Sequence, residues 1–213
     1  MAGPCRRPTL IIEGPGDGAA IPKLMRKICE ERAIFELWPE KNPIMRQNIP
    51  KLSRMGDLEK YVEYGLRRDG DGVLVVLDTD EHCPKVVADL WVPRIRAMAQ
   101  REKRVALAFF KSEFESMFLC CLDHVVEQYP DYGWDLNGWE PERDHERVVG
   151  AKGALSRRMR KGRAYKETRD QVGFVSALDF ARLRDISRSF RHFESTLLWL
   201  VGDHEEDLLP SPE

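Results

Sequence analysis

The chain has 213 residues, of which 42% are hydrophobic and 33% charged, and its formal net charge at pH 7 is -2. This apolar content is enough to build a core and excludes wholesale disorder, and no apolar run approaches the roughly 20 residues that span a bilayer. Because the net charge is slightly negative, a polyanionic partner must meet a local basic patch rather than the chain as a whole.

The five cysteines include no Cys-x-x-Cys pair, and their number is odd. The first residues also lack the apolar core of a secretory signal. This cysteine usage is typical of a reducing compartment, so we predict a cytoplasmic protein without a disulfide framework or a zinc site.

The first part of the chain alternates short apolar runs with amphipathic segments. Thr9–Glu13 and Val73–Leu77 are apolar enough for buried strands, and the residues that follow Asp17 repeat at helical spacing. Such alternation predicts an α/β fold with a parallel sheet covered on both faces. Further strands are expected at 35–38 and 104–110, and further helices at 57–68, 84–101 and 113–128.

The composition changes near Tyr129, after which prolines, glycines and tryptophans precede a basic segment at Lys152–Arg169. Helical spacing returns from Ala177 to Val201. We therefore predict an α/β domain at 1–128, a helical and partly basic region packed on it at 129–202, and a flexible acidic tail at 203–213.

Acidic residues follow the two clearest strands. Glu13 and Asp78 each end an apolar run, Asp80 lies two residues further on, and Asp17 follows the turn after Glu13. The carboxyl ends of parallel strands share one sheet edge, so these carboxylates are expected to meet there and to repel one another. Singly, such residues also serve as helix caps or turns, and only their combination indicates a site. One or two Mg²⁺ or Mn²⁺ ions would relieve the repulsion and would suit phosphodiester hydrolysis.

The acidic motifs resemble those of the TOPRIM domain, the topoisomerase–primase fold, and in particular those of a group of small bacterial members of uncharacterised function. The chain departs from the usual pattern at Gly16-Asp17, where the family has Thr-Glu, so that one carboxylate is shorter by a methylene. The matching positions are Glu13-Gly14, Asp78-Thr79-Asp80, Cys83-Pro84, Glu113-Phe114-Glu115, Tyr165 with Gln171, and Ser189-Phe190.

The resemblance implies a Rossmann-like TOPRIM fold and a metal-dependent nuclease related to the overcoming-lysogenization-defect enzymes. It also implies a role in anti-phage defence beside a partner ATPase of the SMC or ABC type. The alternative is a non-catalytic TOPRIM module that docks on such an ATPase and senses or regulates it, because metal-binding carboxylates can be retained without turnover.

Residues two apart on a helix point away from each other, so Glu113 and Glu115 cannot both enter one site from a regular helix. With Ser112 as N-cap, Glu113 would lie in the first helical turn and join Glu13, Asp17, Asp78 and Asp80 as a metal ligand. Glu115 would then be an outer residue or the partner of Ser112 in a capping box.

Two lysines, Lys111 and Lys166, are candidates to offset charge that develops on a scissile phosphate. The basic segment Lys152–Arg169 is a candidate contact for a DNA or RNA backbone, with Tyr165 stacking on a base. The other interpretations of this segment are a solvated linker and a docking surface for an acidic protein.

Two other enzyme classes are disfavoured by the motifs. A haloacid-dehalogenase phosphatase normally has Thr or Val two residues after the second aspartate, where this chain has His82. A P-loop would need a Lys-Ser/Thr pair, which the turn 14–18 lacks.

Overall fold

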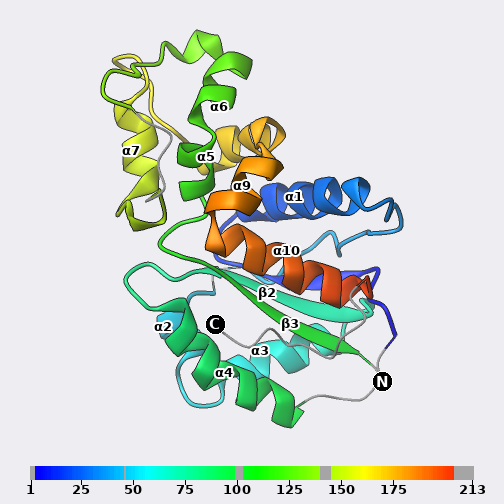
Figure 1. Ribbon diagram of the computed structural model, residues 1–213. Coiled ribbons are helices and arrows are strands. Elements are labelled where there is room, and N and C mark those ends of the chain that lie inside the picture. Colours follow the sequence, from blue (N-terminus) through cyan, green and yellow to red (C-terminus); the bar gives the residue numbers. More distant parts are fainter. Residues whose placement is uncertain (1–2, 46, 99–102, 140–144, 204–213) are drawn as a thin grey trace.

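The computed structural model describes residues 3–45, 47–98, 103–139 and 145–203. Three parallel strands form one sheet in the order β1 (Pro8–Ile11), β2 (Gly72–Asp78) and β3 (Arg104–Phe110) (Figure 1). The α/β class and the parallel sheet predicted from the sequence are thereby confirmed. The predicted acidic tail falls almost wholly outside the described residues.

The sheet is buried on both faces because successive residues of each strand enter different cores. In β2, Leu74 and Val76 join one core, whereas Val73, Val75 and Leu77 join the other. This explains why the strand has a continuous apolar sequence instead of an alternating one.

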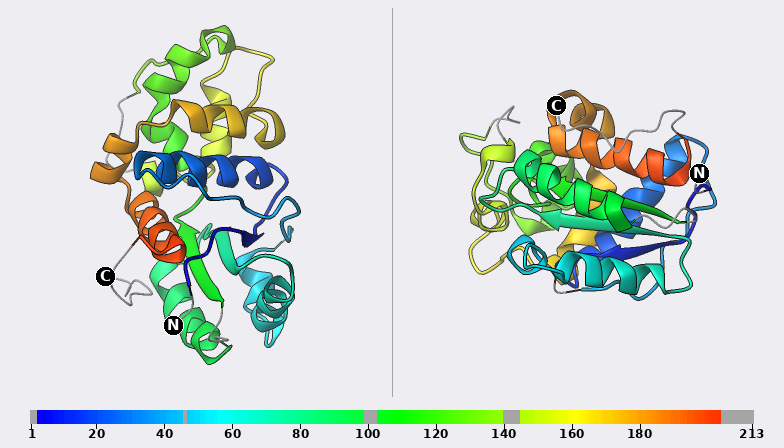
Figure 2. Two further views of the ribbon diagram at one scale, coloured as in Figure 1. Left: turned by 90° about the vertical axis from the view of Figure 1, so that its right-hand side faces the viewer. Right: turned by 90° about the horizontal axis from the view of Figure 1, so that it is seen from below.

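Helices cover the two faces in separate layers (Figure 2). On one side α1 (Asp17–Glu31) lies near α10 (Arg188–Val201), which packs on β3. The other face carries α2 (Ile49–Leu52), α3 (Asp57–Leu66) and α4 (Pro84–Met98).

The remaining helices extend the layer of α1 and α10 beyond the sheet (Figure 1). Lys23 of α1 links this region to the sheet layer, because its ammonium donates a hydrogen bond to the Val172 carbonyl at 2.9 Å. These helices are α5 (Ser116–Cys120), α6 (Leu122–Gln128), α7 (Ala151–Arg157), a π-helical turn (Glu167–Gln171), α8 (Val172–Phe174) and α9 (Phe180–Ile186), with 3-10 turns at Pro130–Tyr132, His145–Arg147 and Val175–Ala177.

The prediction of a strand at 35–38 is wrong. This segment is irregular, and the residue that pairs with β1 is Ile44, which bridges Ile11 in parallel. Pro39 and Pro43 supply no N–H groups and so prevent a continuous ladder between these positions.

Two predicted helices are each broken in two. The helix expected at 113–128 is interrupted at Cys121, and the preceding carbonyl of Cys120 accepts a bond from the Arg182 guanidinium at 3.1 Å. The helix expected at 177–201 breaks at Ser187, whose hydroxyl caps α10 by accepting the Phe190 N–H at 3.1 Å. None of the helices in the described part of the chain combines the length and apolarity needed to cross a membrane.

Candidate functional site

The acidic residues singled out in the sequence surround the carboxyl edge of the sheet. Asp78 is the last residue of β2, Glu13 lies two residues after β1, and Asp17 begins α1. Glu13 interacts electrostatically with Asp17 and Asp80, and Asp78 interacts with Glu13 and Asp17. The structure therefore brings these four acids into one electrostatic cluster from two separate segments, residues 13–17 and 78–80.

The pKa values of these acids are raised, which shows that the cluster contains too little positive charge to neutralise them. Burial first, then Asp80 and Asp17, raises the pKa of Glu13 to about 7. Burial also raises the pKa of Asp17, and burial with a second carboxylate, Glu115, raises the pKa of Asp78 well above its ordinary range. The Glu13 Oε1 atom is buried and has no hydrogen-bond partner in the described part of the chain. An added cation would relieve all of these charges at once.

Asp78 also holds the loop that follows β3. Its Oδ1 accepts the Phe114 N–H at 2.9 Å, which fixes residues 112–115 against the sheet edge. The predicted capping box is wrong: Ser112 has a φ of 62°, its hydroxyl donates to the Glu146 carbonyl at 3.3 Å, and α5 begins only at Ser116. Because the loop is not helical, Glu113 and Glu115 are free of the helical geometry assumed for them.

Lys152, at the start of α7, supplies the cation next to these two glutamates. Its Nζ lies 2.7 Å from Glu167 Oε1, 3.8 Å from Glu113 Oε1 and 3.9 Å from Glu115 Oε2. Its backbone N–H donates to Glu113 Oε2 at 3.2 Å. Burial lowers the pKa of Lys152, but Glu115, Glu167 and Asp78 outweigh it and raise that pKa above its usual value.

Glu115 is the most buried of the acids and is 0% exposed. Its Oε1 accepts the Tyr165 hydroxyl at 2.9 Å, and its Oε2 accepts no hydrogen bond among the described residues. Burial raises its pKa to about 8, against the lowering effect of Lys152 and Tyr165. Glu115, expected to be an outer residue, thus interacts electrostatically with Asp78, and both Glu113 and Glu115 contact Lys152.

The π-helical turn forms the remaining wall of the site. Asp17 accepts the Gln171 amide on Oδ1 at 3.0 Å and the Gly14 N–H on Oδ2 at 2.9 Å. A Cβ at Gly16 would lie 2.7 Å from Glu167 Cβ and closer still to Gln171 Oε1, so only glycine lets the turn pack this tightly. Single π-turns are frequent at functional sites.

The two predicted lysines lie apart from these contacts. Lys166 is exposed and its backbone N–H donates to Asp170 at 2.8 Å, while the Lys111 backbone N–H donates to the Ser189 hydroxyl at 2.9 Å. Within the described ranges, Lys152 is the lysine that forms ion pairs with the acids of the site. The sequence interpretation had placed it in a nucleic-acid-binding segment.

Much of the basic segment is engaged internally. Arg169 forms an ion pair with Asp170 at 2.6 Å, and the Arg163 guanidinium lies 3.4 Å from the centre of the Tyr132 ring. Tyr165, expected to stack on a base, is only 8% exposed and its ring packs against those of Phe118 and Phe174, so that expectation is wrong.

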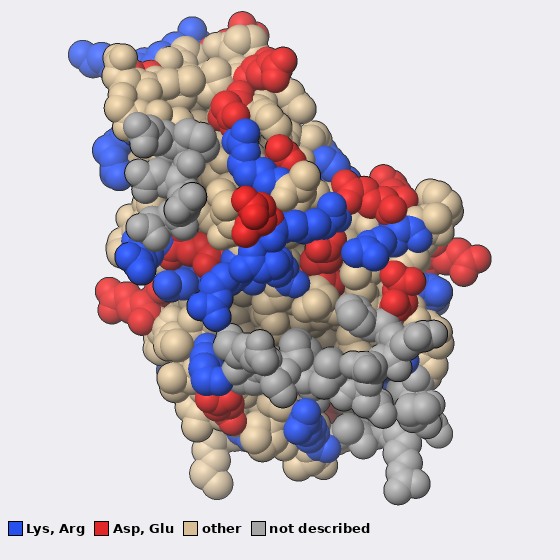
Figure 3. Space-filling model, viewed as in Figure 1, with Lys and Arg blue, Asp and Glu red and all other residues tan. Residues whose placement is uncertain are grey.

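A second basic surface lies over α9 and α10, where Lys and Arg side chains gather across the middle of the molecule (Figure 3). Its arginines are partly neutralised, since Arg184 pairs with Glu31 at 2.5 Å and Arg182 pairs with Asp123 at 2.5 Å. The arginines of these two helices are Arg182, Arg184, Arg188 and Arg191.

The donor set fits a hard divalent cation in its chemistry. All candidate ligands are carboxylate oxygens, and buried oxygens of Glu13 and Glu115 lack hydrogen bonds within the described residues. Throughout that part of the chain, however, no three Asp, Glu, His or Cys side chains converge closely enough to form a ready metal site. Lys152 holds Glu113, Glu115 and Glu167 toward itself, so a shared ion would require these side chains to turn away from it.

The fold and the cluster define an α/β protein with partly buried carboxylates at the carboxyl edge of a parallel sheet. A family model, DUF4276, described as a domain of unknown function, matches residues 12–198. The chain therefore belongs to this family, and the match includes every acid of the cluster. No curated protein and no solved structure matches the chain.

Proposed function

We propose that the protein is a TOPRIM-type nuclease that hydrolyses phosphodiester bonds of DNA or RNA with Mg²⁺ or Mn²⁺. The observation that carries the proposal is that Glu13, Asp17 and Asp78, each partly buried, lie together without enough positive charge to neutralise them. A protein retains such a costly arrangement when a ligand supplies the missing charge.

Glu13, Asp78 and Asp80 are the residues that would hold the ions, with Asp17 and either Glu113 or Glu115 completing the ligand set. When bound, the ions would activate water and stabilise the leaving oxygen of the phosphodiester. Asp17 is oriented for this role by Gln171 and by the Gly14 N–H.

Lys152 takes the role first assigned to Lys111 or Lys166. Its ammonium group lies among the acids and stays charged, since their field raises its pKa. Once Glu113, Glu115 or Glu167 turned toward an ion, the Lys152 ammonium would be free to pair with a phosphate oxygen and to offset the charge that grows there.

The proposal is tested with purified protein, Mg²⁺ or Mn²⁺, and single- and double-stranded DNA and RNA. Asp78→Asn is the decisive variant, because asparagine keeps the Oδ1 acceptor for the Phe114 N–H but removes the charge. We expect it to abolish cleavage without lowering thermal stability. Asp89→Asn, at an exposed position of α4, is the matched control and should cleave normally.

Cleavage that persists in Asp78→Asn would contradict the assigned site. Inactivity of the unaltered protein with every metal and substrate, alone and with an ATPase encoded beside it, would refute the nuclease. The second candidate is then the non-catalytic TOPRIM module that senses or regulates an SMC- or ABC-type ATPase. The observation that favours this alternative is that Lys152 already pairs with Glu113, Glu115 and Glu167, because these acids must leave it before they can bind an ion.

A further inference from the structure

Basic residues from three segments lie around the start of α10. Arg188 and Arg191 belong to α10 itself, where residues three apart share one face of the helix, and both are exposed. The Lys111 N–H donates to the Ser189 hydroxyl at 2.9 Å, so Lys111, which follows β3, lies beside the first turn of α10.

The third segment is the 3-10 turn that contains Arg147. In this turn the Glu146 Oε1 atom accepts the Ser187 hydroxyl at 2.8 Å and the Ser189 N–H at 2.7 Å, which fixes the turn against the start of the helix. Arg147 is the next residue in the chain and is exposed. Together these four residues form the α10 basic cluster, which consists of Lys111, Arg147, Arg188 and Arg191.

Arg191 keeps its positive charge, unlike the arginines of the neighbouring helix. Arg182 and Arg184 form ion pairs with carboxylates. The Arg191 Nη1 atom instead donates to the backbone carbonyls of Arg184 at 2.8 Å and Asp185 at 2.9 Å, which satisfies its hydrogen bonds without cancelling its charge. Lys and Arg side chains gather on this part of the surface (Figure 3), which therefore attracts anions.

The α10 basic cluster adjoins the acids of the candidate site. The Asp80 N–H donates to the Ser112 carbonyl at 3.0 Å, and Ser112 directly follows Lys111 of the cluster. Asp80 and Ser112 both have a positive φ, of 47° and 62°, which is uncommon for residues other than glycine. Backbone strain of this kind concentrates at functional sites. The acids and the cluster are thus neighbours across a strained contact.

This neighbourhood suits a polyanionic strand. The acids repel phosphate groups, so the attraction that brings a strand to them has to come from positive charge beside the site. Lysine and arginine contact phosphate oxygens whatever the base sequence. Protein interfaces usually have apolar side chains at their centre. None of the large exposed hydrophobic side chains of the described residues lies on α9 or α10, which favours nucleic acid over an acidic protein.

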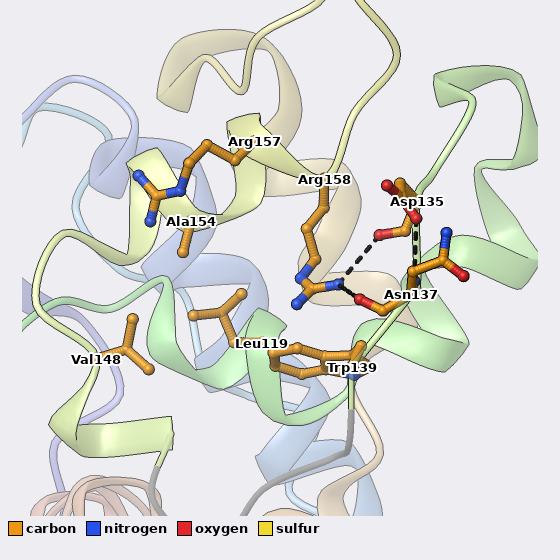
Figure 4. Close-up of a pocket in the computed structure, with 8 residues that line it drawn as sticks. All are labelled: Leu119, Asp135, Asn137, Trp139, Val148, Ala154, Arg157 and Arg158. Atoms are coloured by element: carbon orange, nitrogen blue, oxygen red, sulfur yellow. Dashed lines mark hydrogen bonds between the residues drawn. The ribbon is translucent and has the colours of Figure 1, made fainter.

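The arginines at the end of α7 are arranged differently. Arg157 and Arg158 line a cavity that none of the acids of the candidate site lines (Figure 4). The Arg158 Nη1 atom donates to the carbonyls of Asp135 at 3.1 Å and Asn137 at 3.3 Å. Arg157 is exposed and belongs to the basic segment that the sequence favoured for nucleic acid. It is therefore the natural comparison for the α10 basic cluster.

We propose that the α10 basic cluster binds the phosphate backbone of the substrate strand next to the phosphate at the acids, so that the strand runs from the sheet edge over the start of α10. The proposal rests on the proposed nuclease function and adds the path of its substrate. Because phosphate contacts carry no sequence information, binding at this cluster is independent of base sequence and sensitive to salt.

The experiment measures binding and its salt dependence in Asp78→Asn protein with Ca²⁺ present, by fluorescence anisotropy of a fluorescein-labelled oligo-dT of about 20 nucleotides. For a single strand, each lost phosphate contact reduces the slope of log K against log salt concentration by about 0.7. We expect Lys111→Gln and Arg188→Gln each to reduce the slope by about 0.7, and the double variant by about 1.4.

Two variants with the same kind of change serve as controls. Arg157→Gln alters the basic segment of α7, and Arg67→Gln alters a side chain of α3 that is 78% exposed, on the other face of the sheet. Both should leave the slope unchanged. Thermal unfolding verifies that each variant folds, and Arg147→Gln, with the same expected decrease, replaces either cluster variant that does not.

Unchanged slopes in both cluster variants would overturn the proposal. A slope reduced only in Arg157→Gln would also overturn it and would place the strand on α7. Protein that binds no nucleic acid would overturn it too, and an acidic protein would then be the partner of the cluster. Cleavage by the unaltered protein is assayed separately. Cluster-dependent binding by a protein that never cleaves would preserve the cluster and refute the nuclease, whereas cleavage with unchanged slopes would do the reverse.

Discussion

Replacing Lys152 by methionine removes the ammonium group that lies 2.7 Å from Glu167 and 3.9 Å from the buried Glu115. At an effective dielectric constant of about 20, one such pair about 4 Å apart is worth about 4 kcal/mol. The Lys152 side chain is 37% exposed, so water screens part of this energy. We therefore expect Lys152→Met to lower the free energy of unfolding by about 2 kcal/mol at pH 9.

The loss should shrink at lower pH. The folded-state pKa of Glu115 is about 8, above its ordinary 4.5, so its ionised form is disfavoured in the fold. At pH 6 the carboxyl carries a proton and needs no counterion, and the cost of Lys152→Met should fall below about 1 kcal/mol.

Urea unfolding at pH 6 and pH 9 measures both values, with Lys166→Met as the control because Lys166 is exposed. An equal loss at the two pH values, or no loss at pH 9, would show that Lys152 is not the counterion of Glu115.

Three further changes test other contacts. Glu13→Gln should stabilise the metal-free protein by about 1–2 kcal/mol at pH 8 and give no gain at pH 4.5. The reason is that the folded pKa of Glu13 is raised to about 7, so only the ionised form is penalised. A loss of stability at pH 8 in thermal unfolding would contradict this. Asp71→Ala should cost about 2–3 kcal/mol in urea unfolding, because Asp71 accepts bonds from one thiol and two backbone N–H groups near the N-terminus; a loss below about 0.5 kcal/mol would refute that role. Gly16→Ala should lower the free energy of unfolding by about 1–3 kcal/mol, because the new Cβ crowds Glu167. Gly14→Ala, whose Cβ would meet its nearest atom at 3.5 Å, should lower it less. Equal melting temperatures for the two variants would rule out the steric argument.

Periodicity and composition were sufficient to predict the sheet. Each of the three strands has a run of apolar residues bounded by a turn, and this local signal requires no knowledge of distant contacts. The helix breaks at Cys121 and Ser187 were not predictable in the same way. The Cys120 carbonyl accepts a hydrogen bond from Arg182, which is 62 residues away. Ser187 acts as an N-cap within a sequence that also suits a continuous helix.

The acids at the strand ends were predictable because parallel pairing alone places them at one edge of the sheet. Lys152 was not, since its basic neighbours made it look like part of a solvated or nucleic-acid-binding segment. Its true partners, Glu113 and Glu115, are more than 35 residues away, and composition carries no information on such pairs. Burial of Tyr165 was missed for the same reason, because its partner Glu115 comes from a different segment.

The acids, Lys152 and Gln171 come from segments spread between Glu13 and Gln171. A nascent chain therefore has no complete constellation until translation has passed Gln171, and a fragment released earlier lacks the residue that orients Asp17. For the proposed nuclease, whose substrates would include the nucleic acids of its own cell, this order of assembly would delay activity until synthesis is nearly finished. Premature termination would then yield inert fragments rather than unregulated ones.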